Sequence, residues 1–311
     1  MRLACASFFL VAIAAATSCA RHPATGVTVD PVFRTLIAPD TKALAGAALD
    51  KLKTTPLYRR HEKSLDFPLL DASSERLGVD PRRDISDLAV EWNGGRAVFL
   101  GRGRFNPATV EQKLRALGAR PAKVGKYSLF DIQQNALAFL GRGVVVEGSV
   151  DGLNRIIRLE DKGDGEVPEE LAERLRLLPK GSQIWAVSRG GLPFAELPMR
   201  SDYASALSNI AGYVSGASLG IEVDTGAHVA ADLTCVSAQG AERVRDGLRA
   251  AVAIGRLTTK DDQQDLLKIY DSIRVDQDRE IVRMRADFPQ DLADLLLASL
   301  PELPIGPWRT R

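Results

Sequence analysis

Hydrophobic and polar positions follow the same order in two distant stretches of the chain. Residues 96–118 (RAVFLGRGRFNPATVEQKLRALG) pass from an apolar extended segment through a turn into a helix that places Val110, Leu114 and Leu117 on one face. Residues 228–251 (HVAADLTCVSAQGAERVRDGLRAA) repeat the order of strand, small-residue turn and helix, with TVEQKLRAL aligned on RVRDGLRAA. Similarity of this kind within one chain indicates a duplicated architecture.

The first repeat unit is expected to span residues 34–165. Asn93-Gly94-Gly95 separates two apolar runs, which predicts a tight hairpin and antiparallel pairing. Asn106 is expected to cap the helix that Pro107 begins. The pattern predicts strands at 42–49, 85–92, 97–105, 126–133, 136–140 and 144–148, and helices at 50–62, 64–78, 107–117 and 151–159.

The second repeat unit is expected to span residues 166–311, after a charged, glycine-containing stretch between Glu160 and Lys180 that also holds a short helix. The pattern predicts strands at 183–188, 218–224, 228–236 and 279–286, and helices at 201–214, 238–254, 262–273 and 290–300. Strands joined by hairpins, with helices between groups of strands, predict an α+β fold in which each unit is an antiparallel sheet covered by helices.

The amino terminus has the shape of a secretory signal. Met1-Arg2 is a short basic end, residues 3–16 are almost wholly apolar, and Ala16-Thr17-Ser18 lead into Cys19. The apolar run is too short to span a membrane, which takes about 20 residues. Residues 1–18 are therefore expected to be cleaved as a signal peptide. Residues 19–33, which hold two prolines and little periodicity, are expected to form a flexible tether.

The small residues before Cys19 resemble the lipobox of bacterial lipoproteins, although Ala16 stands where that family usually has Leu. The resemblance implies that Cys19 carries the lipid and becomes the mature amino terminus. Ala20, in place of an Asp, implies the outer membrane, with the body facing the periplasm. The alternative is ordinary cleavage, for example after Ala20, which would release a freely soluble secreted protein.

The composition of the chain indicates which classes of partner are not expected to bind it. The chain has 311 residues, of which 45% are hydrophobic and 26% charged, as in ordinary globular proteins. Its 41 basic and 40 acidic side chains become 40 of each once Arg2 leaves with the signal. Without a basic excess, nucleic acid is not an expected partner. Loss of Cys5 and acylation of Cys19 would leave Cys235 without a disulfide partner, as a small buried hydrophobic residue.

One short motif matches a catalytic pattern. Gly216-Ala217-Ser218-Leu219-Gly220 has the letters of the serine-hydrolase elbow, which requires a strand, a sharp turn and then a helix. Here a helix is expected before the motif and a strand after it, so the favoured interpretation is that the glycines end a helix. The alternative is catalysis by Ser218 with His228 and Asp224.

The sequence signals for anion, dinucleotide and metal binding are weaker than the serine-hydrolase motif. FLGRG occurs at 99–103 and 139–143, where strand bends are favoured over an anion-binding edge formed by Arg102 and Arg142. The Gly101-Arg102-Gly103 stretch lacks the third glycine of a dinucleotide fingerprint. No cofactor is expected, and no metal site, because the three histidines are dispersed and the acidic clusters fit solvated turns. These residues are His22, His61 and His228, with Asp161, Asp164, Glu166, Asp276, Asp278 and Glu280.

The chain therefore predicts a cell-envelope lipoprotein that is not an enzyme and that binds a protein partner or an apolar ligand through its sheets or its repeat interface. An alternative is a periplasmic carrier of a lipid or another hydrophobic ligand, held between the two units. A third hypothesis, a serine hydrolase that uses Ser218, is the least favoured. The sequence does not identify the binding residues.

Overall fold

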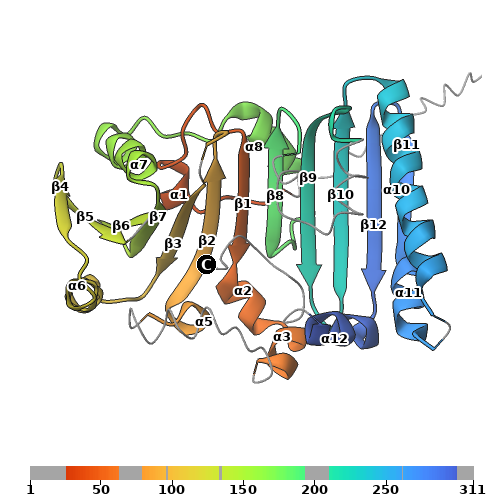
Figure 1. The fold of residues 1–311 in the computed structure, drawn as a ribbon, viewed down its shortest axis with the longest axis horizontal. Helices are drawn as coiled ribbons and strands as arrows, with labels where there is room; N and C mark the ends of the chain where they lie inside the picture. Colours follow the sequence, from red (N-terminus) through yellow and green to blue (C-terminus); the bar gives the residue numbers. More distant parts are fainter. Residues whose placement is uncertain are drawn as a thin grey trace, which may run out of the picture.

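The computed structural model describes residues 26–62, 79–95, 97–132, 135–192, 210–260 and 262–299. Twelve strands form one sheet in the order β11-β12-β10-β9-β8-β1-β2-β3-β7-β6-β5-β4. All neighbouring strands are antiparallel, which confirms the expected antiparallel α+β class. β1 pairs with β8, so the sheet continues from one expected unit into the other (Figure 1).

The strands are β1 Ala43–Ala48, β2 Ile85–Trp92, β3 Val98–Gly103, β4 Pro121–Val124, β5 Tyr127–Ile132, β6 Asn135–Gly141, β7 Val144–Gly148, β8 Ile184–Arg189, β9 Val214–Val223, β10 Ala227–Cys235, β11 Ile273–Asp278 and β12 Ile281–Phe288. The helices are α1 Pro31–Arg34, α2 Leu49–Thr54, α3 Pro56–His61, α5 Pro81–Asp84, α6 Pro107–Ala116, α7 Val150–Lys162, α8 Glu169–Leu177, α10 Ala238–Thr258, α11 Gln264–Ser272 and α12 Gln290–Ser299.

Local chemistry explains several of these boundaries. In the β2–β3 hairpin Gly94 has a φ of 108°, and Gly95 N donates to Asn93 Oδ1 at 3.2 Å, so the expected hairpin is confirmed. Asn106 Oδ1 accepts from Ala108 N at 3.0 Å and begins α6, as expected of an N-cap.

Helices cover the sheet unequally. The face that carries Leu44 of β1 is called the A face here, and the opposite face, which carries Ala45, is the B face. On the A face, α1, α7 and α8 pack over the strands from β8 to β5. The largest fully buried side chains that these helices and the α1–β1 connection supply are Phe33, Leu36, Ile37, Leu153, Ile156, Ile157 and Leu171.

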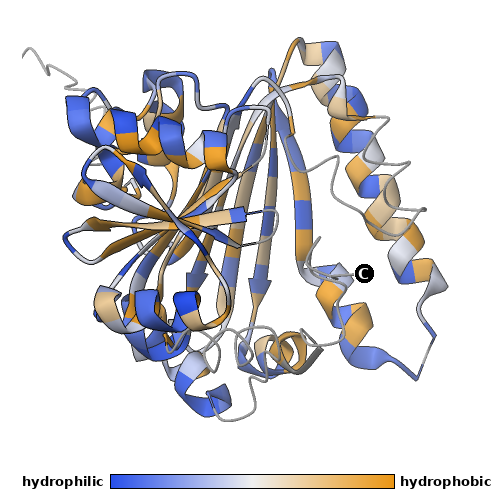
Figure 2. Cartoon of the chain, turned by 60° about the vertical axis from the view of Figure 1, so that its left-hand side comes forward, coloured by the Kyte–Doolittle hydropathy of each residue, from blue (hydrophilic) through white to orange (hydrophobic). Residues whose placement is uncertain are grey.

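Two amphipathic helices lie on the B face, one near each end of the sheet (Figure 1). α6 buries Val110 and Leu114 against β5 and β6. α10 buries Ala241 and Val244 against β10, β11 and β12. Figure 2 shows hydrophobic and hydrophilic stretches alternating along the long helix α10, as a helix with one packed face requires.

Several sequence expectations need correction. Val29 and Phe33 are 4% and 1% exposed, so the packed body begins before residue 34, inside the expected tether. Thr55–Pro56 divides the helix expected at 50–62, because Thr55 is extended and caps α3. The expected helix at 64–78 and most of that at 201–214 lie outside the described residues.

Two strands are absent from the sequence expectations. β4 begins with a proline and is mostly exposed, and β11 alternates apolar with charged residues directly after a helix. In addition, β9 begins at Val214, four residues before the expected start at Ser218. α8 contributes Leu171 and Leu175 to the core that the first expected unit forms, so no break in packing occurs at residue 166.

Candidate functional site

The middle of the B face is a broad apolar surface between α6 and α10. One row of paired residues crosses the sheet on this face, each residue opposite the next on the neighbouring strand. The row is Leu137, Glu147, Phe99, Val90, Ala45, Ala186, Leu219, Ala231 and Met284, taken from β6 to β12. Its first member lies beneath α6 and its last packs into the cluster beneath α10.

The middle of this row is accessible. Val90, Ala45, Ala186 and Leu219 are all partly exposed, and their neighbour Leu88 is 38% exposed. Strands that are apolar on both faces are typical of sheets covered on both faces. On the A face the same strands are covered, because Leu44, Ala89 and Val187 lie in the main core. In the part of the chain that the structure describes, the middle of the B face is therefore an apolar surface less buried than the A face.

One ionisable side chain lies on this apolar face. Burial raises the pKa of the Glu147 carboxyl, and a hydrogen bond from Asn135 Nδ2 at 3.4 Å opposes that rise only in part. Glu147 pairs with Phe99 across β7 and β3, at the α6 side of the surface. A carboxylate in such surroundings costs stability unless a partner or a proton neutralises it.

The A face differs between the two halves of the sheet. On β10, β12 and β11 most A-face positions are charged or polar and are at least partly exposed. Their side chains are largely paired with one another. The ion pairs are Arg285 Nη1–Asp232 Oδ1 at 2.7 Å and Arg283 Nη2–Asp278 Oδ2 at 3.0 Å, and His228 Nδ1 forms a hydrogen bond with Asp287 Oδ1 at 2.7 Å. A shallow hollow on this surface is lined by Arg274 and Arg285, by the carboxylates Glu222, Asp276 and Asp287, and by His228 and Pro179.

A buried ion pair lies beneath α7. Glu91 of β2 is 0% exposed and accepts from Arg155 Nη1 at 2.9 Å, from Arg155 Nη2 at 2.5 Å and from Thr41 Oγ1 at 2.7 Å. The bidentate geometry and the third donor satisfy the carboxylate fully. A second hollow borders Arg155, Asp151 and Asn93. Because Arg155 is paired with Glu91 and, at 3.4 Å, with Asp40, the ion pair joins α7 to the sheet.

The structure separates the residues of the serine-hydrolase alternative. Ser218 lies in the middle of β9, 6% exposed and opposite Asp232. His228 lies four residues from Asp232 along β10, roughly 13 Å away at the rise of a strand. Asp224 is in the exposed β9–β10 turn, and its carbonyl accepts from Leu57 N at 2.9 Å. A proton transfer from Ser218 to His228 requires contact within hydrogen-bond reach, which this geometry does not provide.

The motif glycines do not end a helix, contrary to the favoured interpretation, since both lie within β9. A Cβ at Gly216 would overlap the guanidinium of Arg174, and one at Gly220 would overlap Ser182 Oγ. Arg174 Nη1 donates to Thr234 Oγ1 at 2.8 Å, and burial lowers the pKa of its guanidinium. The glycines therefore let α8 and its loop pack closely on β9.

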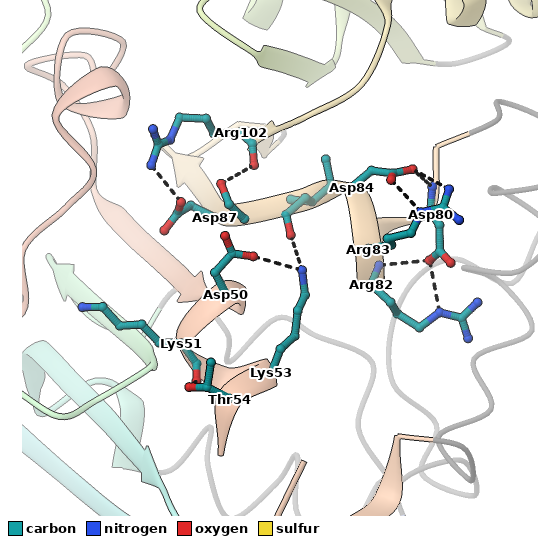
Figure 3. Close-up of polar contacts among 12 residues, drawn as sticks. Asp50, Lys51, Lys53, Thr54, Asp80, Arg82, Arg83, Asp84, Asp87 and Arg102 are labelled. Atoms are coloured by element: carbon teal, nitrogen blue, oxygen red, sulfur yellow. Dashed lines mark hydrogen bonds and ion pairs between the residues drawn. The ribbon is translucent and has the colours of Figure 1, made fainter. Parts of the chain in front are cut away.

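The two FLGRG stretches hold paired arginines rather than an open anion site. Arg102 Nη2 lies 2.6 Å from Asp30 Oδ2 and 3.0 Å from Asp87 Oδ2, and the second contact is drawn in Figure 3. Arg142 Nη2 contacts both carboxylate oxygens of Glu160, at 2.7 and 2.8 Å. Figure 3 also shows Lys53 bonded to Asp50 beside the start of β2. The charged side chains near the start of β2 and the end of β3 are therefore paired with one another. The first stretch continues β3 to Gly103, opposite a register shift in β2, whereas the second stretch ends in a tight turn.

The other residues that the sequence singled out, Cys235 and His61, lie in surroundings that indicate a structural role. Cys235 is buried without a disulfide partner, and burial raises the pKa of its thiol, which disfavours the reactive thiolate. His61 Nε2 lies 2.7 Å from Asp294 Oδ1, which ties α3 to α12. Within the described ranges no group of three or more His, Cys, Asp or Glu side chains could hold a metal ion.

Cys19 and His22 lie outside the described residues. No helix in the part of the chain that the structure describes is long and apolar enough to cross a bilayer. The described chain starts against α8: Val27 N donates to Leu175 O at 2.9 Å, and a Cβ at Gly26 would overlap the backbone of Arg176.

Comparison with known proteins shows the fold alone. No family model and no curated protein matches the chain. The structures of crystal forms III and IV of TP0453 each align with a TM-score of 0.51 at 9% sequence identity. The alignments cover 89% of this chain and 99% and 98% of those chains.

Neither of the two surfaces described above follows from the sequence pattern alone. For the B face a signal is present, because β1 reads ALAGAA and β2 has apolar residues on both faces. For the A-face hollow there is none, since it depends on the register between β11, β12 and β10.

Proposed function

We propose that the protein is a non-catalytic binding module of the cell envelope, and that the middle of the B face is its binding surface. The observation that carries this proposal is the accessible apolar row across β2, β1, β8 and β9, with Leu88 exposed at its border. Exposed apolar surface that extends over several strands is characteristic of interaction sites, unlike single exposed hydrophobic residues.

The dimensions and chemistry favour an amphipathic helix of a partner protein as the occupant. From β3 to β9 the surface spans four strand spacings, roughly 19 Å, while a helix with its side chains is about 10–12 Å across. Small residues at Ala45, Ala47 and Ala186 allow a helix to approach closely. This chain covers the two ends of the same face in the same way, with α6 and α10.

We further propose that a lipid on Cys19 holds the module at the outer membrane, facing the periplasm. The signal-like segment before Cys19 supports this proposal. A Cys19→Ser variant should be released from membranes into the soluble fraction, and mass spectrometry of the wild type should find acyl chains on an amino-terminal Cys19. An unmodified mature terminus at another residue would refute the anchor.

The arrangement of strands supports a duplication of one unit. In the first half β1, β2 and β3 are followed by α6 on the B face, and β7 then pairs with β3. In the second half β8, β9 and β10 are followed by α10 on the B face, and β12 then pairs with β10. β4 and β5 are found only in the first half and α11 only in the second. We propose two diverged copies joined through β1 and β8.

Photo-crosslinking in intact cells tests the binding surface. The photoreactive residue p-benzoylphenylalanine replaces Leu88 on the B face or, as controls, Leu177 and Leu257, which are 78% and 80% exposed elsewhere. Position 88 should give one discrete adduct with a protein, and the controls should not give that adduct. Mass spectrometry of the crosslinked peptide should place the attachment on an apolar residue of a partner helix.

Two other outcomes contradict the protein-partner assignment. An adduct between position 88 and lipid would favour the alternative function, a carrier of a hydrophobic ligand, for which the same apolar surface is the supporting observation. An adduct confined to this chain would mean that the protein covers its own B face, and the proposed surface would be wrong.

A further inference from the structure

Glu147 is a single carboxylate on an otherwise uncharged face. On β7 it lies opposite Leu137 of β6 and opposite Phe99 of β3, in the row that continues to Val90 and Ala45. Among the described B-face positions of the strands that run in sheet order from β6 to β12, it is the one acidic or basic side chain. Any group that docks on the middle of this face therefore meets one charge at its β7 border.

The carboxylate of Glu147 is incompletely bonded within the chain. Asn135 Nδ2 donates to Oε1 at 3.4 Å, and Oε2 accepts no hydrogen bond from a described residue. Burial raises the pKa of the carboxyl, and no neighbouring cation opposes this rise. Because Glu147 is still partly exposed, a donor that approaches from the B face can reach it.

Glu91, on the opposite face of the sheet, shows how the chain satisfies a carboxylate that it buries with its own residues. It accepts two hydrogen bonds from Arg155 and one from Thr41. Glu147 has no such cation, so a group that covers it must supply the missing donor or force the carboxyl to take up a proton. A helix without a matching cation would leave the charge unpaired and would bind less well, which makes Glu147 a determinant of specificity.

The position of Glu147 indicates which part of the docked helix meets it. Neighbouring strands are about 4.8 Å apart, so Glu147 lies roughly 10 Å from Val90, at the flank of a helix about 10–12 Å across that rests on β2, β1 and β8. Lys and Arg at such a flank lay their methylene groups along apolar surface while the charged head reaches outward. Building on the function proposed above, we infer that the docked helix carries a Lys or Arg at this flank and that this cation pairs with Glu147.

This pairing gives binding a pH dependence of defined sign. A cation beside Glu147 lowers the pKa of the carboxyl in the complex relative to the free protein, so binding should strengthen as the pH rises through the free-protein value and weaken as it falls. Apolar cover alone would raise that pKa further and reverse the sign. The described residues paired with or bonded to Glu147 are Leu137, Phe99 and Asn135, none of which titrates.

Crosslinking from position 88 in intact cells, combined with substitutions at Glu147, tests the pairing. Glu147→Gln keeps the shape of the side chain and removes its charge, and it should reduce the yield of the protein adduct roughly tenfold or more. Because this substitution should stabilise the fold, loss of the adduct would not report unfolding. Glu111→Gln is the matched control: it removes a carboxylate of α6 on the same side of the sheet that already pairs with Arg115 at 3.8 Å, and the yield should stay unchanged.

A synthetic peptide of the crosslinked helix then identifies the cation. Glu147 lies two strand spacings and one row from Leu88, roughly 12 Å, so a Lys or Arg should occur within about two helical turns of the attachment site. Replacing that residue by Glu should weaken binding to the wild-type chain roughly tenfold or more and restore binding to the Glu147→Lys variant. Fluorescence anisotropy between pH 4 and pH 8 should show tighter binding at the higher pH, and Glu147→Gln should remove this dependence.

Equal adduct yields from the wild type and Glu147→Gln would overturn the pairing and leave the B face as the binding surface, and so would peptide binding that strengthens as the pH falls. Failure of the charge exchange between the peptide and Glu147→Lys would also count against it. If position 88 gives no protein adduct even with Glu147 intact, the proposed function fails and the pairing fails with it. The two failures are therefore distinguished by the crosslink in the chain that keeps Glu147.

Discussion

Asp30 joins the start of the folded body to the sheet, because its Oδ2 lies 2.6 Å from Arg102 Nη2 on β3. Its other carboxylate oxygen accepts from Val32 N at 2.8 Å and begins α1. The Asp30 side chain is only 8% exposed, whereas the Arg102 side chain is 37% exposed, so the carboxylate is the shielded member of the pair. This residue thus fixes the segment that connects the expected lipid anchor to the module.

Asp30→Ala should lower the free energy of unfolding by about 2–4 kcal/mol, because it removes the helix cap and leaves Arg102 with one fewer carboxylate partner. Asp50→Ala is the control: Asp50 is 67% exposed and pairs with Lys53 at 3.2 Å, so its loss should cost less than about 1 kcal/mol. Urea denaturation of both variants measures the difference. Equal costs would mean that residues 26–33 do not contribute to the cooperative fold.

Glu91→Gln should be the most destabilising single-charge substitution among the described ion pairs. The carboxylate is fully buried and bonded by Arg155 and Thr41, and breaking such a pair typically costs about 3–5 kcal/mol. Glu169→Gln, at an exposed pair with Arg176, should cost less than about 1 kcal/mol. Thermal unfolding at matched pH compares the two, and similar midpoints would show that the Glu91 pair does not hold α7 to the sheet.

Glu147→Gln should stabilise the protein at pH 7. Because the folded-state pKa of Glu147 is raised by burial, its stabilising effect is present below the unfolded-state value of about 4.3 and is lost as pH rises through the folded-state value. The advantage of the Gln variant should therefore be largest at neutral pH and shrink toward pH 4. Denaturation curves across this range test the sign. A Gln variant less stable than the wild type at pH 7 would show that the carboxylate has a stabilising partner.

Much of the fold follows from local chemistry in the sequence. The hairpin at Asn93-Gly94 and the cap at Asn106 lie where turn and capping chemistry predict them. The extended start of β9 does not follow in this way, because its glycines resemble helix ends until the packing of α8 is known. Asp30 falls within the expected tether, since prolines without periodicity look like a linker when the buried partner Arg102 is far along the chain.

The two candidate surfaces, the B face and the A-face hollow, are harder to predict from the sequence than the fold is. Arg274 and Arg285 become neighbours only through the pairing of β11 with β12, and the sequence pattern does not predict β11 itself. The B-face row joins residues of different strands in one register, and no short turn connects β1 with β2 or with β8 to fix that register locally.

The core positions of the two amphipathic helices give a further prediction. Leu114 of α6 is 1% exposed, whereas Leu248 of α10 is only partly buried. Leu114→Ala should cost about 2–5 kcal/mol, and Leu248→Ala should cost less, because the transfer term scales with the area buried. Chemical denaturation of both variants checks the order, and a larger loss at Leu248 would contradict this account of the packing.

Cysteine accessibility tests most directly whether the B face binds a partner in the cell. Leu88→Cys, Leu257→Cys and Ala43→Cys place a thiol on the proposed surface, at an exposed helix position and at a buried B-face position that is 3% exposed. Each is labelled with a maleimide in the purified protein and in intact envelopes. The account predicts that the thiol at position 88 reacts in the purified protein and is protected in envelopes, that the thiol at position 257 reacts in both, and that the thiol at position 43 reacts in neither. Equal labelling of the Leu88→Cys variant in the two preparations would contradict the claim that the B face is a binding surface.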